Sequence, residues 1–132
     1  MTRSLRTAFI FVFLLLLGLC ALPKTGQAQD TSGYTLSELQ AEASSLIESK
    51  SFVAVRPFLL ELVKRFEGES EQLRQNLEPV YFYLGVGFMV EYSESGDAQY
   101  LNKAIEWLNR LNKEFPDGNF AVLANLSLAD CY

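Results

Sequence analysis

Apolar and polar positions alternate with a period of three to four residues along most of the chain, which predicts a series of amphipathic helices. The first helix is expected over residues 36–49, because Thr35 and Glu38 have the spacing of a capping box. Ser51 has the side chain of an N-cap for the second helix. Pro57 lies inside that second apolar pattern, so the helix either kinks there or begins there, since proline is tolerated only in a first turn.

The middle of the chain continues the helical pattern with one interruption. Gly68 is expected to cap the end of the second helix. Residues 70–92 are periodic but contain Pro79, which predicts either a bend near that residue or two shorter helices. Residues 81–90 are rich in aromatic and β-branched side chains, so a strand is an alternative there. A helix is favoured because no turn dipeptide or partner strand accompanies this segment.

The last third of the chain predicts two more helices separated by turns. Residues 93–97 are polar and include a glycine, which indicates a loop, and a further helix is expected over residues 100–115. It ends at residues 116–118, Pro-Asp-Gly, and a last helix begins near Asn119. Its apolar pattern is still running at Tyr132, which favours an N-terminal fragment or an exposed last helix.

One face of the stretch Tyr81–Phe88 predicts where the helices meet. Tyr81, Leu84, Gly85 and Phe88 share this face if the stretch is helical. Glycine inside a helix costs about 1 kcal/mol relative to alanine. We therefore expect a neighbouring helix to approach closely at Gly85, with the larger residues of this face in the core.

The first 28 residues have the features of a secretory signal peptide. Arg3 and Arg6 precede an uninterrupted apolar run over residues 8–22, and small residues follow up to Ala28. The run is shorter than the roughly 18–20 residues that span a bilayer. Cleavage after Ala28 is expected, and an uncleaved membrane anchor is the alternative. Residues 29–35 are then a short polar linker.

Charge and composition exclude several classes of function. Residues 29–132 carry 8 basic and 16 acidic residues, a net charge of −8, which disfavours binding to nucleic acid or to an anionic membrane surface. The chain contains no histidine, so a Ser-His or Cys-His catalytic arrangement is absent. Cys131 is the only cysteine after the expected cleavage, and its apolar helical setting indicates a buried small side chain. We therefore predict no catalytic residue, no cofactor and no metal site.

The pattern of the third and fourth helices resembles the tetratricopeptide repeat, a family of stacked helical hairpins. The matching positions are Tyr81, Leu84, Gly85, Phe88, Ala104, Leu108 and Pro116. The gap between Phe88 and Ala104 is about seven residues longer than the repeat of about 34 allows, so an enlarged loop is expected over residues 92–100. The resemblance implies an all-α solenoid over residues 36–132, made of two hairpins and the start of a third.

The same resemblance implies a concave surface lined by the first helix of each hairpin. Transferred by position, the candidate groove residues are Phe82, Val86, Met89, Gln40, Ser44 and Ile47. The first three form a second apolar stripe beside the core face. Packing of that stripe against a neighbouring helix is the alternative to a partner-binding role.

Together these features favour a non-enzymatic scaffold that binds a protein or peptide partner in the bacterial cell envelope. An exported helical-repeat protein resembles scaffold and assembly factors of the periplasm or outer membrane. A non-catalytic N-terminal repeat domain of a longer secreted enzyme is the alternative, and a self-association module is a third possibility. Contact with the membrane is expected only through an uncleaved signal segment.

Overall fold

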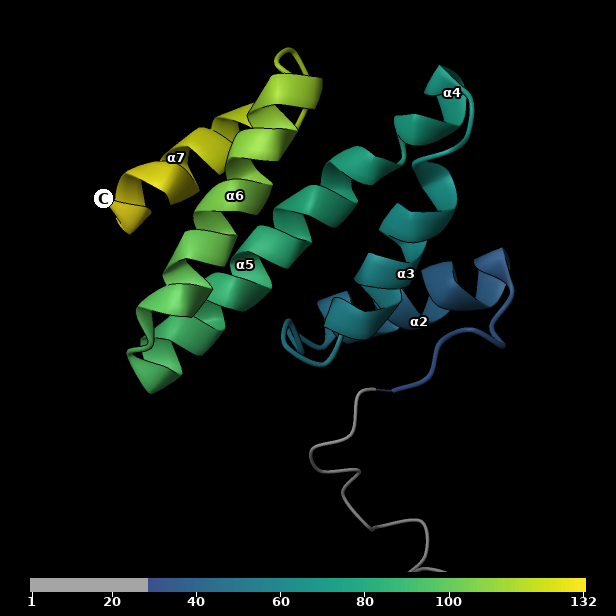
Figure 1. Cartoon of the computed structure of the whole chain (residues 1–132), viewed down its shortest axis with the longest axis horizontal. Coiled ribbons are helices and arrows are strands. Elements are labelled where there is room, and N and C mark those ends of the chain that lie inside the picture. The colour runs from purple at the N-terminus through teal and green to yellow at the C-terminus, as the bar shows by residue number, and fades with distance from the viewer. Residues whose placement is uncertain (1–28) are drawn as a thin grey trace, which may run out of the picture.

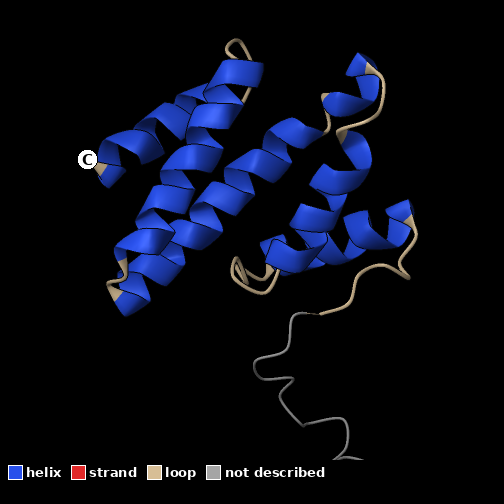
Figure 2. Cartoon of the chain, viewed as in Figure 1, coloured by secondary structure: helices blue, strands red, loops and turns tan. Residues whose placement is uncertain are grey.

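The computed structural model describes residues 29–132, and this part of the chain is all-helical, with no strand (Figures 1 and 2). The predicted signal peptide lies outside the described residues. Five helices and a single helical turn follow one another: α2 (Leu36–Glu48), α3 (Arg56–Phe66), the one-turn α4 (Glu71–Arg74), α5 (Leu77–Ser95), α6 (Ala98–Glu114) and α7 (Ala121–Cys131). The strand alternative for residues 81–90 is therefore wrong.

The starts of the first two helices follow local chemistry. The capping box of α2 is confirmed: the Glu38 amide donates to Thr35 Oγ1 at 3.2 Å, and the Thr35 amide donates to Glu38 Oε2 at 2.7 Å. Ser51 does not cap α3, which begins at Arg56 with Pro57 in its first turn. Proline is pre-organised for that position and needs no amide partner there, so the later start is the alternative that holds.

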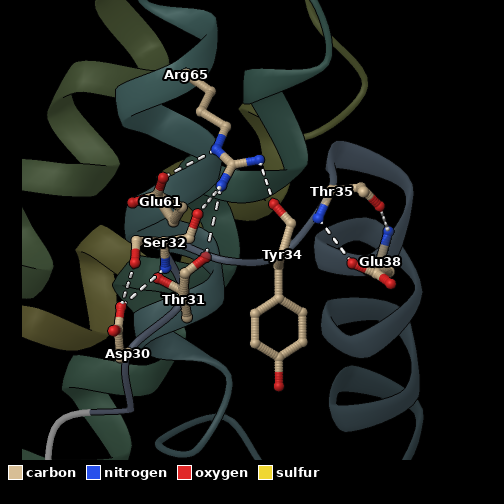
Figure 3. A network of polar contacts seen from close by, with 8 residues as sticks. All are labelled: Asp30, Thr31, Ser32, Tyr34, Thr35, Glu38, Glu61 and Arg65. Atoms are coloured by element: carbon tan, nitrogen blue, oxygen red, sulfur yellow. Dashed lines mark hydrogen bonds and ion pairs between the residues drawn. The ribbon is translucent and has the colours of Figure 1, made fainter.

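Residues 31–34, within the predicted linker, are bonded to α3 (Figure 3). Arg65 Nη1 donates to the Tyr34 carbonyl at 2.7 Å, and Nη2 lies 3.4 Å from the Ser32 carbonyl and 3.5 Å from that of Thr31. The Tyr34 ring also meets the Phe58 ring edge-on, with centroids 5.5 Å apart. One guanidinium therefore fixes the path by which the chain enters α2.

The breaks between the later helices differ from those expected. Gly68 does not adopt a left-handed conformation, and Glu67 is the C-cap of α3. The helix breaks after α4 at residues 75–76, ahead of Pro79, which then lies in the first turn of α5. A first turn tolerates proline because its amides have no partner within the helix.

The enlarged loop predicted over residues 92–100 is also wrong. α5 continues to Ser95, and α6 starts at Ala98. Gly96 alone reverses the chain, with a left-handed φ of 70°, and Asp97 caps α6 through a 2.9 Å bond from the Gln99 amide. The other residues of the expected loop therefore belong to α5 and α6. The turn can be this short because glycine adopts a left-handed conformation without steric cost.

Close helix packing at Gly85 is confirmed. A Cβ atom at this position would lie 2.7 Å from Cδ2 and 2.8 Å from Cγ of Leu108 on α6. The partners α5 and α6 form the most extensive helix pair of the described chain. Six of the predicted core residues are buried: Tyr81, Leu84, Gly85, Phe88, Ala104 and Leu108. Pro116 is exposed, because it lies in the turn after α6, where its lack of an amide ends the helix.

Candidate functional site

A concavity of about 490 Å³ opens between α2, α3 and α5. Its walls come from all three helices: Gln40, Ala43, Ser44, Ile47 and Glu48 from α2, Leu59, Leu62 and Phe66 from α3, and Asn76, Pro79, Val80 and Tyr83 from the start of α5. The volume is within the 300–1,000 Å³ range of pockets that receive a ligand or a partner side chain. This is the candidate functional site.

The concavity exists because of how the hairpins meet. α5 packs on α3, whereas α2 packs mainly on α3 and makes few contacts with α5. Figure 1 shows α2 and α3 together on one side, with α5, α6 and α7 as a second group. The space that direct stacking of α2 on α5 would fill is therefore left open to solvent.

The floor and the rim of the concavity differ in chemistry. Leu59, Leu62, Phe66 and Val80 are buried and apolar, so the floor offers no hydrogen-bonding side chain. Gln40, Ser44, Glu48 and Asn76 are exposed and polar, and they surround this floor. An apolar floor inside a polar rim is the usual composition of a recognition pocket.

The predicted groove residues of α2 lie on this surface. Gln40, Ser44 and Ile47 all line the concavity, spaced four and three residues apart on one face of the helix. Gln40 and Ser44 are exposed, and Ile47 is half-buried. Their role in binding remains a prediction.

The predicted groove residues of α5, in contrast, do not line the concavity. The Phe82 ring faces α7, with its centroid 5.3 Å from that of Phe120, and Met89 packs against the core. Val86 is half-buried and is not part of the cavity wall. The α5 wall is instead the stripe Asn76, Pro79, Val80 and Tyr83. Sequence reasoning missed it because positions transferred from the family pattern do not determine how α5 is rotated about its axis relative to α2.

A cluster of charged side chains that do not line the concavity joins α3, α5 and α6. Arg110 Nη2 donates to Glu67 Oε1 at 2.6 Å, and its Nε donates to Glu114 Oε1 at 3.0 Å. The Tyr81 hydroxyl donates to Glu114 Oε2 at 3.0 Å, and Arg74 lies 3.5 Å from the same oxygen. The arginine therefore ties the end of α3 to α6, which is a structural role.

The pKa values in this cluster follow from burial and charge. Burial is the main cause that raises the pKa of the Tyr81 hydroxyl to about 12. Burial alone would raise the pKa of Glu114, but the hydrogen bonds from Arg110 and Tyr81 outweigh it and lower that pKa. Glu114 is therefore held as a carboxylate and is not poised to exchange a proton near neutral pH.

No three acidic or cysteine side chains of residues 29–132 gather into a possible metal site. Cys131 is half-buried rather than fully buried, and burial raises its pKa, which keeps the thiol protonated and weakly nucleophilic. No helix within the described range is both long and apolar enough to cross a bilayer.

The outer face of α7 is apolar and exposed. Val122, Leu123 and Leu126 are 69%, 45% and 61% exposed, whereas Ala124 and Leu128 are buried beneath the helix. Nothing in the described part of the chain covers these three side chains.

Comparison with known proteins does not assign the chain to a family. No family model, no curated protein and no solved structure matches it.

Proposed function

We propose that this chain is a non-enzymatic interaction scaffold whose concavity between α2, α3 and α5 receives a side chain of a protein partner. The observation that carries the proposal is the open apolar floor formed by buried residues of α3 and α5. A partner side chain would bury its own apolar surface against this floor, which contributes about 25 cal/mol per Å². The absence of histidine from the sequence supports a binding role over an enzymatic one.

The proposal includes a solenoid arrangement similar to the tetratricopeptide repeat. The hairpins α2–α3 and α5–α6, with α7 packed on α6, support it, as does the close approach at Gly85. In such a stack each hairpin covers the apolar face of its neighbour. We further propose export to the bacterial envelope, for which the charged and apolar pattern of residues 1–28 is the support.

Filling the concavity tests the binding role. Ser44→Trp places a large ring in the cavity from an exposed position, and Ser45→Trp places the same ring on the same helix outside the lining. Twelve-residue peptides selected by phage display on the full chain serve as probes. We expect selected peptides to lose at least tenfold in affinity for Ser44→Trp and to bind Ser45→Trp as they bind the wild type.

Two results would overturn the proposal. One is that no peptide is enriched in repeated selections. The other is that the selected peptides bind both tryptophan variants equally, which would place their binding site elsewhere on the chain. Circular dichroism of both variants establishes that the helices are retained.

A further inference from the structure

We propose that the concavity selects partner segments in which an apolar side chain is flanked by basic residues, and that the carboxylate of Glu48 attracts those basic residues. This inference rests on the proposed function, because it names the partner chemistry of the same site. The concavity would then select partner segments by their charge as well as by their shape.

The floor determines the central side chain of such a segment. Leu59, Leu62 and Phe66 are each 2–3% exposed and present only carbon to the cavity. A polar group placed there would lose its hydrogen bonds to water without replacement, which costs about 1–3 kcal/mol. A large aliphatic or aromatic side chain carries no such penalty, and the volume of about 490 Å³ accommodates one.

The rim determines the flanking residues. Among the described residues that line the cavity, Glu48 is the only charged one, and none is a lysine or arginine. Lys50 follows two residues later but is not part of the wall. An acidic flank would therefore meet a negative charge and no positive one, whereas a basic flank would meet a complementary charge.

The position of Glu48 strengthens this assignment. It is the last residue of α2, where the helix dipole disfavours a carboxylate, and no basic residue occupies that last turn. Within residues 29–132 its side chain makes no hydrogen bond or ion pair. Glu42 and Glu94 likewise make no side-chain hydrogen bond or ion pair among the described residues, so what distinguishes Glu48 is its place in the cavity lining.

The charge of the whole domain acts in the same direction. A net charge of −8 over residues 29–132 attracts a cationic segment and repels an anionic one before contact. This long-range attraction does not depend on one residue, so an experiment must separate it from the local effect of Glu48. Glu42 provides the comparison, because it is an exposed glutamate of α2 that does not line the cavity.

The test uses two synthetic peptides with the same Leu-Phe-Leu centre, one flanked on both sides by three lysines and the other by three glutamates. Their affinities for the full chain are measured by fluorescence anisotropy at low and at physiological salt. The same measurements are made on Glu48→Lys and Glu42→Lys, which change the net charge equally. We expect the lysine-flanked peptide to bind the wild type at least tenfold more tightly than the other.

The preference is the ratio of the two peptide affinities. We expect Glu48→Lys to lower this ratio roughly fivefold more than Glu42→Lys does, which corresponds to the loss of an ion pair at the rim worth up to about 1 kcal/mol. Equal affinities of the two peptides, or preference for the glutamate flanks, would overturn the inference and leave the proposed function standing. Equal effects of the two substitutions would also overturn it, because the preference would then come from the overall charge. If neither peptide bound even at millimolar concentration, both this inference and the proposed function would fail.

Discussion

Replacing Gly85 with alanine is expected to destabilise the fold, although alanine is the better helix former. A Cβ atom there would lie 2.7 Å from Leu108 Cδ2, about 1 Å short of the separation at which carbon atoms pack best. Leu108 is fully buried, so a shift of its side chain would have to displace the closely packed side chains around it. The clash costs about 1–3 kcal/mol, and the gain in helix propensity offsets about 1 kcal/mol of it. A net loss of up to about 2 kcal/mol follows.

The assay is urea unfolding followed by circular dichroism, with thermal melting as a second measurement. A loss of 1 kcal/mol lowers the melting temperature of a domain of this size by about 4–8 °C. Gly68→Ala is the matched control, because a Cβ there meets nothing within 4 Å and the residue has no positive φ. We expect this control to be unchanged or stabilised by up to about 1 kcal/mol, through a less flexible unfolded chain.

A double-mutant cycle identifies the contact responsible. Leu108→Ala alone should cost about 2–5 kcal/mol by leaving a cavity beside Gly85. The methyl group of Gly85→Ala then occupies part of that cavity, so the double variant should be more stable than additivity predicts by about 1–2 kcal/mol. Wild-type stability of Gly85→Ala, together with additive energies in the cycle, would refute the close approach of α5 and α6.

Three further predictions test other parts of the structure. Lys50 has a φ of 59° and forms a Schellman turn with α2, so Lys50→Gly should raise the urea unfolding free energy by about 0.5–1 kcal/mol; a loss would contradict the left-handed geometry. The pKa of Tyr81 is about 12 in the folded chain against an ordinary 10. The contribution of its protonated hydroxyl to the free energy of unfolding is therefore complete below pH 10 and is lost as the pH rises through 12. Tyr81→Phe should therefore show a smaller fall in the urea midpoint between pH 10 and pH 12, and an unchanged fall would refute the shift. Arg65→Met should cost about 1–2 kcal/mol and speed amide hydrogen exchange at the start of α2, where unchanged exchange would show that the guanidinium does not hold residues 31–34.

Local sequence signals predicted the helix types and several of their ends. The capping box at Thr35 and the close approach at Gly85 could be inferred because each depends on a rule about single residues in helices. The turn at Gly96 was visible as a glycine, but its length was not. Polar residues before it suggested a loop, whereas Ser93 and Ser95 instead bond back to carbonyls of the preceding helical turn.

The candidate site could be predicted only in part, because it depends on how helices meet. The α2 wall follows from helical spacing within one element, so Gln40, Ser44 and Ile47 could be placed together from the sequence. The α5 wall depends on the rotation of α5 about its axis relative to α2. No periodicity in the sequence determines that rotation, because α5 is apolar on nearly all sides.

Two glycines on opposite sides of α5 explain both its central position and the extent of the concavity. Gly85 and Gly87 are two residues apart, which places them about 200° apart around the helix. The first admits Leu108 of α6, and the second admits the backbone carbonyl of Phe52 before α3, since a Cβ at Gly87 would lie 2.5 Å from that oxygen. α5 can therefore be packed closely by α6 on one side and by the first hairpin on the other.

Gly87 also continues the stripe of α5 that lines the concavity. The wall runs through Asn76, Pro79, Val80 and Tyr83, and the next position on the same face is residue 87. There Phe52 approaches the helix, and its ring stacks on Tyr83 with centroids 6.1 Å apart. Neither Phe52 nor Gly87 lines the cavity, so the α5 wall ends at Tyr83, where this contact begins. The same small residue thus joins the first hairpin to α5 and sets the length of the surface open to a partner.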